Sequence, residues 1–166
     1  MNQEISNPQE MLTTIVTQEE TLRLQRFTAQ DGWQLGLAAR ELAIAHGGSV
    51  AVDVTIGNVQ VFRCTVGMAT PNNARWIRRK TNVVMDSWKS SLRVMLELQQ
   101  SGRTMAEFGW SNEDFVLSGG GFPLHVLGMG VVGAITLSGL PQTHDHQLAV
   151  DALAAVLGVK VPSILA

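Results

Sequence analysis

Cysteine is almost absent from this chain, and neither sign of charge is in excess. Cys64 is the only cysteine, which excludes an intrachain disulfide and fits a reducing compartment. Charged residues make up 16% of the chain, and 12 Lys and Arg against 14 Asp and Glu give a net charge of -2. A nucleic-acid-binding surface needs a basic footprint, and an anionic membrane attracts polybasic segments. The charge balance therefore argues against both partners.

Long apolar runs are missing as well. The N-terminal segment has no basic start followed by an apolar stretch, so it does not resemble a secretory signal. No apolar segment reaches the roughly 18 residues that a membrane-spanning helix needs. The longest candidate, residues 124–140, is interrupted by glycines and favours a hairpin. We therefore expect a cytoplasmic protein without a membrane partner.

The composition does provide material for a core. The chain has 166 residues, of which 45% are apolar, and this suits one domain. We expect a single domain over residues 17–166, after a partly flexible segment over residues 1–16. Thr17 and Glu20 match a capping box and predict a helix from about residue 18. Asp31 is expected to cap a second helix, which Gly47-Gly48 ends.

Two hairpins are expected in the sheet. Residues 49–56 alternate between apolar and polar, as a half-buried strand does, and Gly57-Asn58 is a two-residue turn into a return strand over residues 59–66. A second hairpin is expected to join strands 124–127 and 131–137.

Helices are expected around these hairpins. The predicted helical elements are a long amphipathic helix over residues 73–100, a short helix or turn within 103–117, and a last helix from Thr143 to Gly158. The fold class is therefore α+β, with an antiparallel sheet of about four to five strands covered by helices.

One charged side chain falls within the apolar stripe of the long helix. Lys80 lies three residues after Ile77 and four before Val84, and Ser91 lies likewise between apolar positions. One interpretation places Lys80 at the edge of the stripe, with its stem buried and its ammonium group in water. The other has Lys80, with Arg79 or Arg75, meeting an anionic ligand or a carboxylate of another subunit.

The segment Gly119–Pro123 (GGGFP) is a second candidate. Three glycines permit backbone conformations closed to other residues and allow close approach. No GK[ST] follows and the next element is a strand, so the segment is neither a P-loop nor a dinucleotide fingerprint. It predicts either a bulge where a strand enters the sheet or a loop that contacts a ligand.

Four histidines offer little support for a metal site. His144 and His146 diverge on a helix, and no second cluster has ligand spacing, so we expect no metal. A single axial histidine suffices for a haem iron, which leaves His125 and His146 as candidates on chemical grounds. Cys64 is expected to be a small buried apolar group, and no nucleophile–base pair stands out.

Several motifs together resemble those of one protein group. They are W-x-x-R-K (Trp76, Arg79, Lys80), Ser90-Ser91, G-G-x-F-P (Gly119, Gly120, Phe122, Pro123) and S-G-L-P-Q-x-x-D-H (Ser138 to His146). They resemble a widespread family of uncharacterised proteins related to the HbpS-like haem-degrading, GlcG-like and PduO C-terminal domains. The similarity runs from about residue 17 to residue 160.

The resemblance implies an α-β-α layered, profilin-like or HbpS-like domain that forms homo-oligomers. By relation it implies binding of haem, another tetrapyrrole or a different small anionic ligand. If the motif residues form one site, Arg79 and Lys80 would supply positive charge. Ser90 and Ser91 would supply hydrogen bonds, and Trp76 and Phe122 apolar walls. The remaining members of this candidate ligand-binding set are Gly119, Gly120 and Pro123.

Three functions remain open at this point. The first is a cytoplasmic small-ligand-binding domain that acts as a homo-oligomer. The second is an oligomeric interaction or scaffold protein without catalysis, because the four Trp and the cluster from Arg75 to Lys80 would also suit an interface. The third is a haem-related redox or degrading enzyme, which would require His125 or His146.

Overall fold

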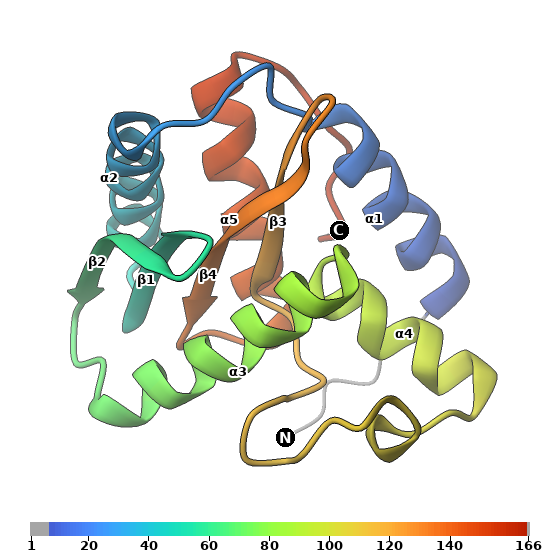
Figure 1. The fold of residues 1–166 in the computed structure, drawn as a ribbon. Coiled ribbons are helices and arrows are strands. Elements are labelled where there is room, and N and C mark those ends of the chain that lie inside the picture. The colour runs from blue at the N-terminus through green and yellow to red at the C-terminus, as the bar shows by residue number, and fades with distance from the viewer. Residues whose placement is uncertain (1–6, 166) are drawn as a thin grey trace.

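The computed structural model describes residues 7–165. Within this range the chain forms one antiparallel sheet and six helical segments (Figure 1). In chain order the elements are α1 (Pro8–Thr21), α2 (Ala29–His46), β1 (Val50–Ile56), β2 (Val59–Val66), α3 (Pro71–Ser87), α4 (Ser91–Ser101), the 3-10 helix η1 (Met105–Phe108), β3 (Gly121–Val126), β4 (Gly130–Ser138) and α5 (Gln142–Leu157). The α+β class and both hairpins are confirmed.

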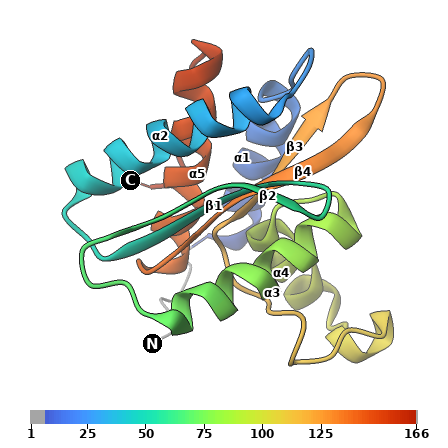
Figure 2. The same cartoon turned by 60° about the vertical axis from the view of Figure 1, so that its left-hand side comes forward.

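The sheet has four strands in the order β2-β1-β4-β3, and every neighbouring pair is antiparallel. Helices α2 and α5 cover one face, and α3 and α4 lie on the other, which gives the expected α-β-α layers (Figure 2). The main core lies between the sheet and the α2–α5 layer. No helix among residues 7–165 is both long and apolar enough to cross a bilayer.

The first helix begins earlier than the sequence predicted. The side chain of Asn7 accepts a hydrogen bond from the Glu10 backbone N–H, and Pro8 occupies the first helical position, so α1 starts at Pro8 rather than near residue 18. Ile15 of α1 packs with Leu92 and Leu96 of α4. Residues 8–16 are thus helical and packed on the domain. The expected flexibility of residues 1–6 lies outside the described residues.

The cap of α2 is Thr28, not Asp31. The Thr28 hydroxyl accepts from the Asp31 N–H, and the Asp31 carboxylate accepts from the Thr28 N–H at 2.8 Å. Asp31 therefore closes the capping box from the third helical position. The expected helix end is confirmed, because Gly47 takes the left-handed conformation at φ +79°.

Strand β1 is buried on both faces, so the expectation of a half-buried strand is wrong. Val52 and Val54 belong to the core beneath α2 and α5, while Ala51 and Asp53 are buried on the α3 side. Apolar and polar residues do alternate along β1, but the helical layer that contains α3 covers the polar face as well. Burial raises the pKa of Asp53, and the Arg63 guanidinium, with its Nε 2.8 Å from Asp53 Oδ2, opposes that shift.

The long helix expected over residues 73–100 is two helices. Trp88 adopts a left-handed conformation at φ +59° and ends α3, and the Ser90 hydroxyl accepts from the Arg93 N–H to cap α4. The apolar stripe continues across this corner because both helices pack on the same side of the sheet. Two further boundaries shift: β3 starts at Gly121 rather than 124, and α5 starts at Gln142, one residue before the expected cap Thr143.

Candidate functional site

Lys80 lies at the junction of α3, β4 and α5. Its side chain is 3% exposed, and its Nζ donates to Asp145 Oδ2 at 3.1 Å and to the Leu137 carbonyl at 3.0 Å. The ammonium group is therefore not in water, and that interpretation is wrong. Lys80 does meet a carboxylate, but the carboxylate comes from α5 of the same chain.

Asp145 is satisfied on both oxygens. Its Oδ1 accepts from the Leu140 N–H at 3.1 Å, and its Oδ2 accepts from the Gly139 N–H at 3.3 Å as well as from Lys80. Burial raises the pKa of Asp145 and lowers the pKa of Lys80, and the charge of each partner opposes the shift of the other. The pair thus fixes the first turn of α5 against α3.

The glycines before β3 make room for this junction. A Cβ at Gly120, where φ is +128°, would lie 2.4 Å from the Leu137 carbonyl oxygen and 2.8 Å from Lys80 Nζ. A Cβ at Gly119 would lie 2.4 Å from the Gln142 carbonyl oxygen. The Ser91 hydroxyl accepts from the Gly121 N–H at 3.0 Å. The glycines therefore allow close approach by the protein's own backbone.

The sequence-based site set divides into two groups. Lys80, Ser91 and the glycines meet in the buried junction, and Ser90 is buried next to it at the start of α4. Phe122 and Pro123 are also buried, in β3. The other group is Trp76 and Arg79, which face outward from α3. The structure therefore places these residues in two regions of the chain.

His146 is completely buried. Its Nε2 lies 2.9 Å from Gln18 Oε1, and its ring meets Phe122 edge-on with centroids 5.7 Å apart. Burial lowers the pKa of His146 from 6.5 to about 3, so the imidazole is neutral at physiological pH. His146 is thus packed in the interior. His125 is partly exposed on β3.

Three arginines surround a surface hollow of about 430 Å³ beside α3. Arg75 donates to Asn72 Oδ1 at 3.1 Å, and Arg79 donates to the Phe115 carbonyl at 3.3 Å, so both guanidinium groups bond only neutral acceptors. Arg78 pairs with Asp114 at 2.8 Å. Neither Arg75 nor Arg79 forms an ion pair within residues 7–165. We call this hollow, lined by Asn72, Arg75, Trp76, Arg78, Arg79, Asn112 and Glu113, the arginine pocket.

The loop after α4 is tied to α3 and forms one wall of the arginine pocket. Asn82 donates to the Asp114 carbonyl at 2.8 Å, and the Trp110 indole donates to Asp86 Oδ2 at 2.7 Å. Trp110 also stacks on Phe115 with centroids 4.9 Å apart. Because these contacts lie along one side of α3, the loop that carries Asn112 and Glu113 is held in place.

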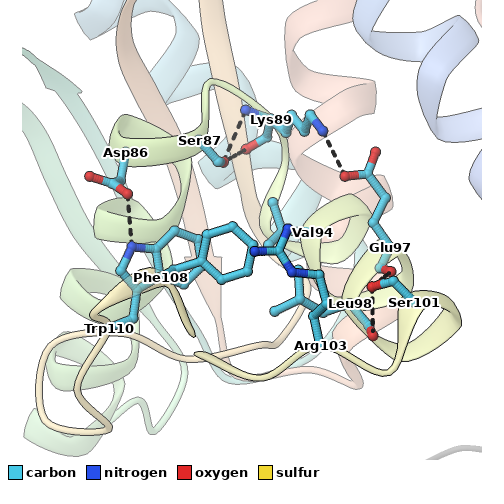
Figure 3. A pocket seen from close by; sticks show the side chains of 10 residues that line it. All are labelled: Asp86, Ser87, Lys89, Val94, Glu97, Leu98, Ser101, Arg103, Phe108 and Trp110. Atoms are coloured by element: carbon cyan, nitrogen blue, oxygen red, sulfur yellow. Dashed lines mark hydrogen bonds and ion pairs between the residues drawn. The ribbon is translucent and has the colours of Figure 1, made fainter. Parts of the chain in front are cut away.

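A second hollow of about 430 Å³ is lined by the end of α3, by α4 and by residues between Arg103 and Trp110 (Figure 3). Val94, Leu98 and the ring of Phe108 provide apolar surface, and the Arg103 guanidinium lies 4.3 Å from the Phe108 centroid. Lys89 is paired with Glu97 at 2.7 Å. Since its cations are already occupied in this way, the second hollow is less suited to an anion than the arginine pocket.

Sequence reasoning missed Asp145 as the partner of Lys80 and Arg78 as part of the arginine pocket. Asp145 lies in the motif S-G-L-P-Q-x-x-D-H, in the first turn of a helix, where a carboxylate accepts from preceding N–H groups. That position is a usable signal for a fixed carboxylate. No group of three or more His, Cys, Asp or Glu side chains within residues 7–165 is arranged to hold a metal ion.

Comparison with known proteins agrees with this architecture. The family model described as "Haem degrading protein HbpS-like" matches residues 27–154. The "UPF0303 protein" of Rhizobium rhizogenes is 43% identical over 147 residues, which cover 89% of this chain and 91% of the relative.

Two solved structures share the fold. The crystal structure of the Ybr137w protein is 26% identical with a TM-score of 0.81 and covers 89% of this chain and 87% of its own. The crystal structure of a "PduOC:Heme Complex" is 20% identical with a TM-score of 0.66 and covers 82% of this chain and 97% of its own. Because the sequence identity to the PduOC structure is 20%, this similarity shows a shared fold alone.

Proposed function

The chain belongs to the HbpS-like family of haem-degrading proteins, and from this premise we propose that it binds a small anionic ligand in the arginine pocket. The family description favours a tetrapyrrole, whose edge carries carboxylates. The observation that carries the proposal is that, in the part of the chain that the structure describes, Arg75 and Arg79 bond only neutral acceptors at one hollow.

The chemistry of the pocket suits a carboxylate or phosphate. A guanidinium group presents parallel N–H donors that match a carboxylate bidentately, and such charge-assisted bonds are stronger than neutral ones. Glu113 is the one carboxylate side chain within residues 7–165 that lines the pocket, against three arginines. The positive charge therefore exceeds the negative charge at this hollow.

Trp76 would provide a planar apolar wall. The Arg79 guanidinium lies 5.2 Å from the centroid of a Trp76 ring, which fixes both groups relative to one another. An aromatic surface beside two cations fits a flat molecule with anionic substituents. This combination favours a tetrapyrrole edge over a small inorganic anion.

The same pocket does not fit the iron of a haem. Among the described residues, no histidine, cysteine or methionine lines it, and His146 is buried against Gln18 and Phe122. The ligand would thus be bound through its carboxylates. A haem-degrading or redox activity through His125 or His146 gains no support from the positions of these side chains.

Two porphyrins distinguish these modes of binding. The full chain is titrated with haemin and with protoporphyrin IX, which has the same two propionates and no iron, and binding is followed by absorbance and fluorescence. Recognition of the carboxylates predicts saturable 1:1 binding of both with similar Kd. Binding of haemin alone would mean that the iron is the recognised group, and binding of neither would overturn the proposal.

A second candidate function is assembly into a homo-oligomer through an apolar surface at the β3–β4 turn. Trp88 is 54% exposed and Met129 is 71% exposed, and the Trp88 ring lies against Gly130. Large exposed apolar groups that adjoin one another are typical of a protein interface. A second copy of the chain would cover this surface, which the change Trp88→Gly tests below.

A further inference from the structure

Two histidines that are far apart in the sequence meet at the surface where α2 ends and α5 begins. His46 is the last residue of α2, and His144 lies in the first turn of α5. The His46 Nε2 and His144 Nδ1 atoms are 3.2 Å apart, and the two rings are nearly perpendicular. Neither the buried junction nor the arginine pocket includes them.

We propose that His46 and His144 form a surface site for a divalent transition metal ion, with Zn²⁺ as the representative. Imidazole nitrogens bind Zn²⁺ at about 2.0–2.1 Å. Two nitrogens 3.2 Å apart then subtend an angle of about 100° at the metal, between the tetrahedral and octahedral values. The spacing of the two nitrogens thus suits two adjacent ligands of one ion.

The backbone on both sides holds this spacing. Gly47 follows His46 in the left-handed conformation, and its N–H donates to the Ala43 and Ile44 carbonyls. The His144 N–H donates to the Pro141 carbonyl at 2.8 Å. Because α2 and α5 pack on each other over the same face of the sheet, both histidines project from fixed elements.

A change of tautomer would free both facing nitrogens for the ion. In the metal-free pair, the N–H of one imidazole donates to the ring nitrogen of the other, and the tautomers decide which ring is the donor. When the donor ring carries its hydrogen on its second nitrogen instead, both facing nitrogens offer lone pairs to the ion. His46 is exposed and His144 is partly exposed, so an ion reaches them from solvent.

The donor set selects the class of metal. Imidazole suits Zn²⁺, Cu²⁺ and Ni²⁺, whereas Ca²⁺ and Mg²⁺ prefer oxygen ligands. No third His, Cys, Asp or Glu joins the pair within the described part of the chain. The remaining positions would be taken by water, and the affinity would be lower than that of a structural site with four protein ligands.

Isothermal titration with Zn²⁺ tests the proposal on the full chain without a polyhistidine tag. The variants are His46→Gln and His144→Gln, and His125→Gln is the matched control, because His125 lies on β3 outside the pair. One Zn²⁺ should bind per wild-type and control chain. Removing either ligand should weaken binding by at least roughly 10–100-fold, which is typical even when only a side chain that hydrogen-bonds to a metal ligand is changed.

Thermal unfolding gives a second readout. Because the ion would bind the folded pair, saturating Zn²⁺ should raise the Tm of the wild-type and His125→Gln chains and leave the Tm of the other two variants unchanged. Absence of 1:1 binding by the wild-type chain would overturn the proposal, whether or not the variants fold. Wild-type affinity in both His46→Gln and His144→Gln would overturn it as well.

Discussion

Lys80 Nζ lies 3.1 Å from Asp145 Oδ2, and side chains of both residues are almost completely buried. The pair joins the middle of α3 to the first turn of α5, and the Gly139 and Leu140 N–H groups complete the shell of Asp145. A buried ion pair is costly to break, because removal of one partner leaves an uncompensated charge in the interior. The pair is therefore a structural element of the fold.

Loss of one partner should destabilise the protein strongly. Lys80→Met is expected to lower the free energy of unfolding by about 3–5 kcal/mol, measured by urea denaturation. The double variant Lys80→Met/Asp145→Leu removes both charges and should recover part of this loss. As a control, Lys89→Met breaks a more exposed pair with Glu97 and should cost less than about 1 kcal/mol. If Lys80→Met also cost less than about 1 kcal/mol, the structural role of the Lys80–Asp145 pair would be contradicted.

Alanine substitutions at two glycines with positive φ distinguish the stability cost of crowding from the stability cost of backbone strain. Gly128 has φ +78° and open space around a Cβ, so Gly128→Ala should cost only the left-handed strain, about 1–2 kcal/mol. Gly120→Ala adds a clash with the Leu137 carbonyl and Lys80, and should cost at least twice as much. Chemical denaturation of both variants measures the difference, and equal losses would mean that the GGGFP segment is not required for close packing.

The buried His146 predicts a pH dependence of stability. Its pKa is about 3 in the folded chain and close to 6.5 in an unfolded one, so the unfolded state binds more protons between these values. Stability due to the neutral ring is complete above pH 6.5 and is lost as the pH falls towards 3.

The slope of the free energy of unfolding against pH measures the contribution of His146 to this dependence. Between the two pKa values, His146 should contribute about 1.4 kcal/mol of lost stability per pH unit. Urea denaturation from pH 7 to pH 4 should give a shallower dependence for His146→Gln than for wild type. His125→Gln, which changes a partly exposed histidine, serves as the control. Parallel curves for wild type and His146→Gln would show that the ring titrates normally.

Removal of the Trp88 ring tests the proposed assembly surface. Glycine suits the left-handed backbone at this position, so Trp88→Gly removes the exposed ring without introducing strain. If a second copy covers the ring, the dissociation constant of the oligomer should rise by roughly 30-fold or more, as it does when a residue at the centre of an interface is removed. Light scattering over a concentration series measures the mass. Trp33→Gln on α2 is the control, and a greater loss of assembly in that variant would place the interface elsewhere.

Local patterns were sufficient to predict most elements of the fold. The alternation over residues 49–56, the Gly57-Asn58 turn and the glycines of the second hairpin determine the strands through short-range geometry. The corner at Trp88 could not be found in this way. Its backbone conformation is unusual for a non-glycine residue, and the apolar stripe shows no break there.

The candidate site was less accessible to sequence reasoning. The position of Lys80 in an apolar stripe correctly marked it as unusual, but its partner Asp145 is 65 residues away, and only the tertiary fold brings them together. Arg79 and Lys80 are adjacent in sequence yet point to different surroundings, because neighbouring side chains on a helix diverge by about 100°. The family motif thus combines a buried junction with part of a surface pocket.

Arg75 offers the most direct test of ligand binding in the arginine pocket, because it donates to the side chain of Asn72 and its loss leaves the contacts of the loop with α3 intact. The measurement is the Kd of protoporphyrin IX for wild type, Arg75→Gln and the matched control Arg40→Gln, which removes the same charge from α2. We predict that Arg75→Gln weakens binding about 10-fold or more, as for loss of a charge-assisted hydrogen bond, and that Arg40→Gln has no effect. Equal Kd values for all three chains would contradict the account.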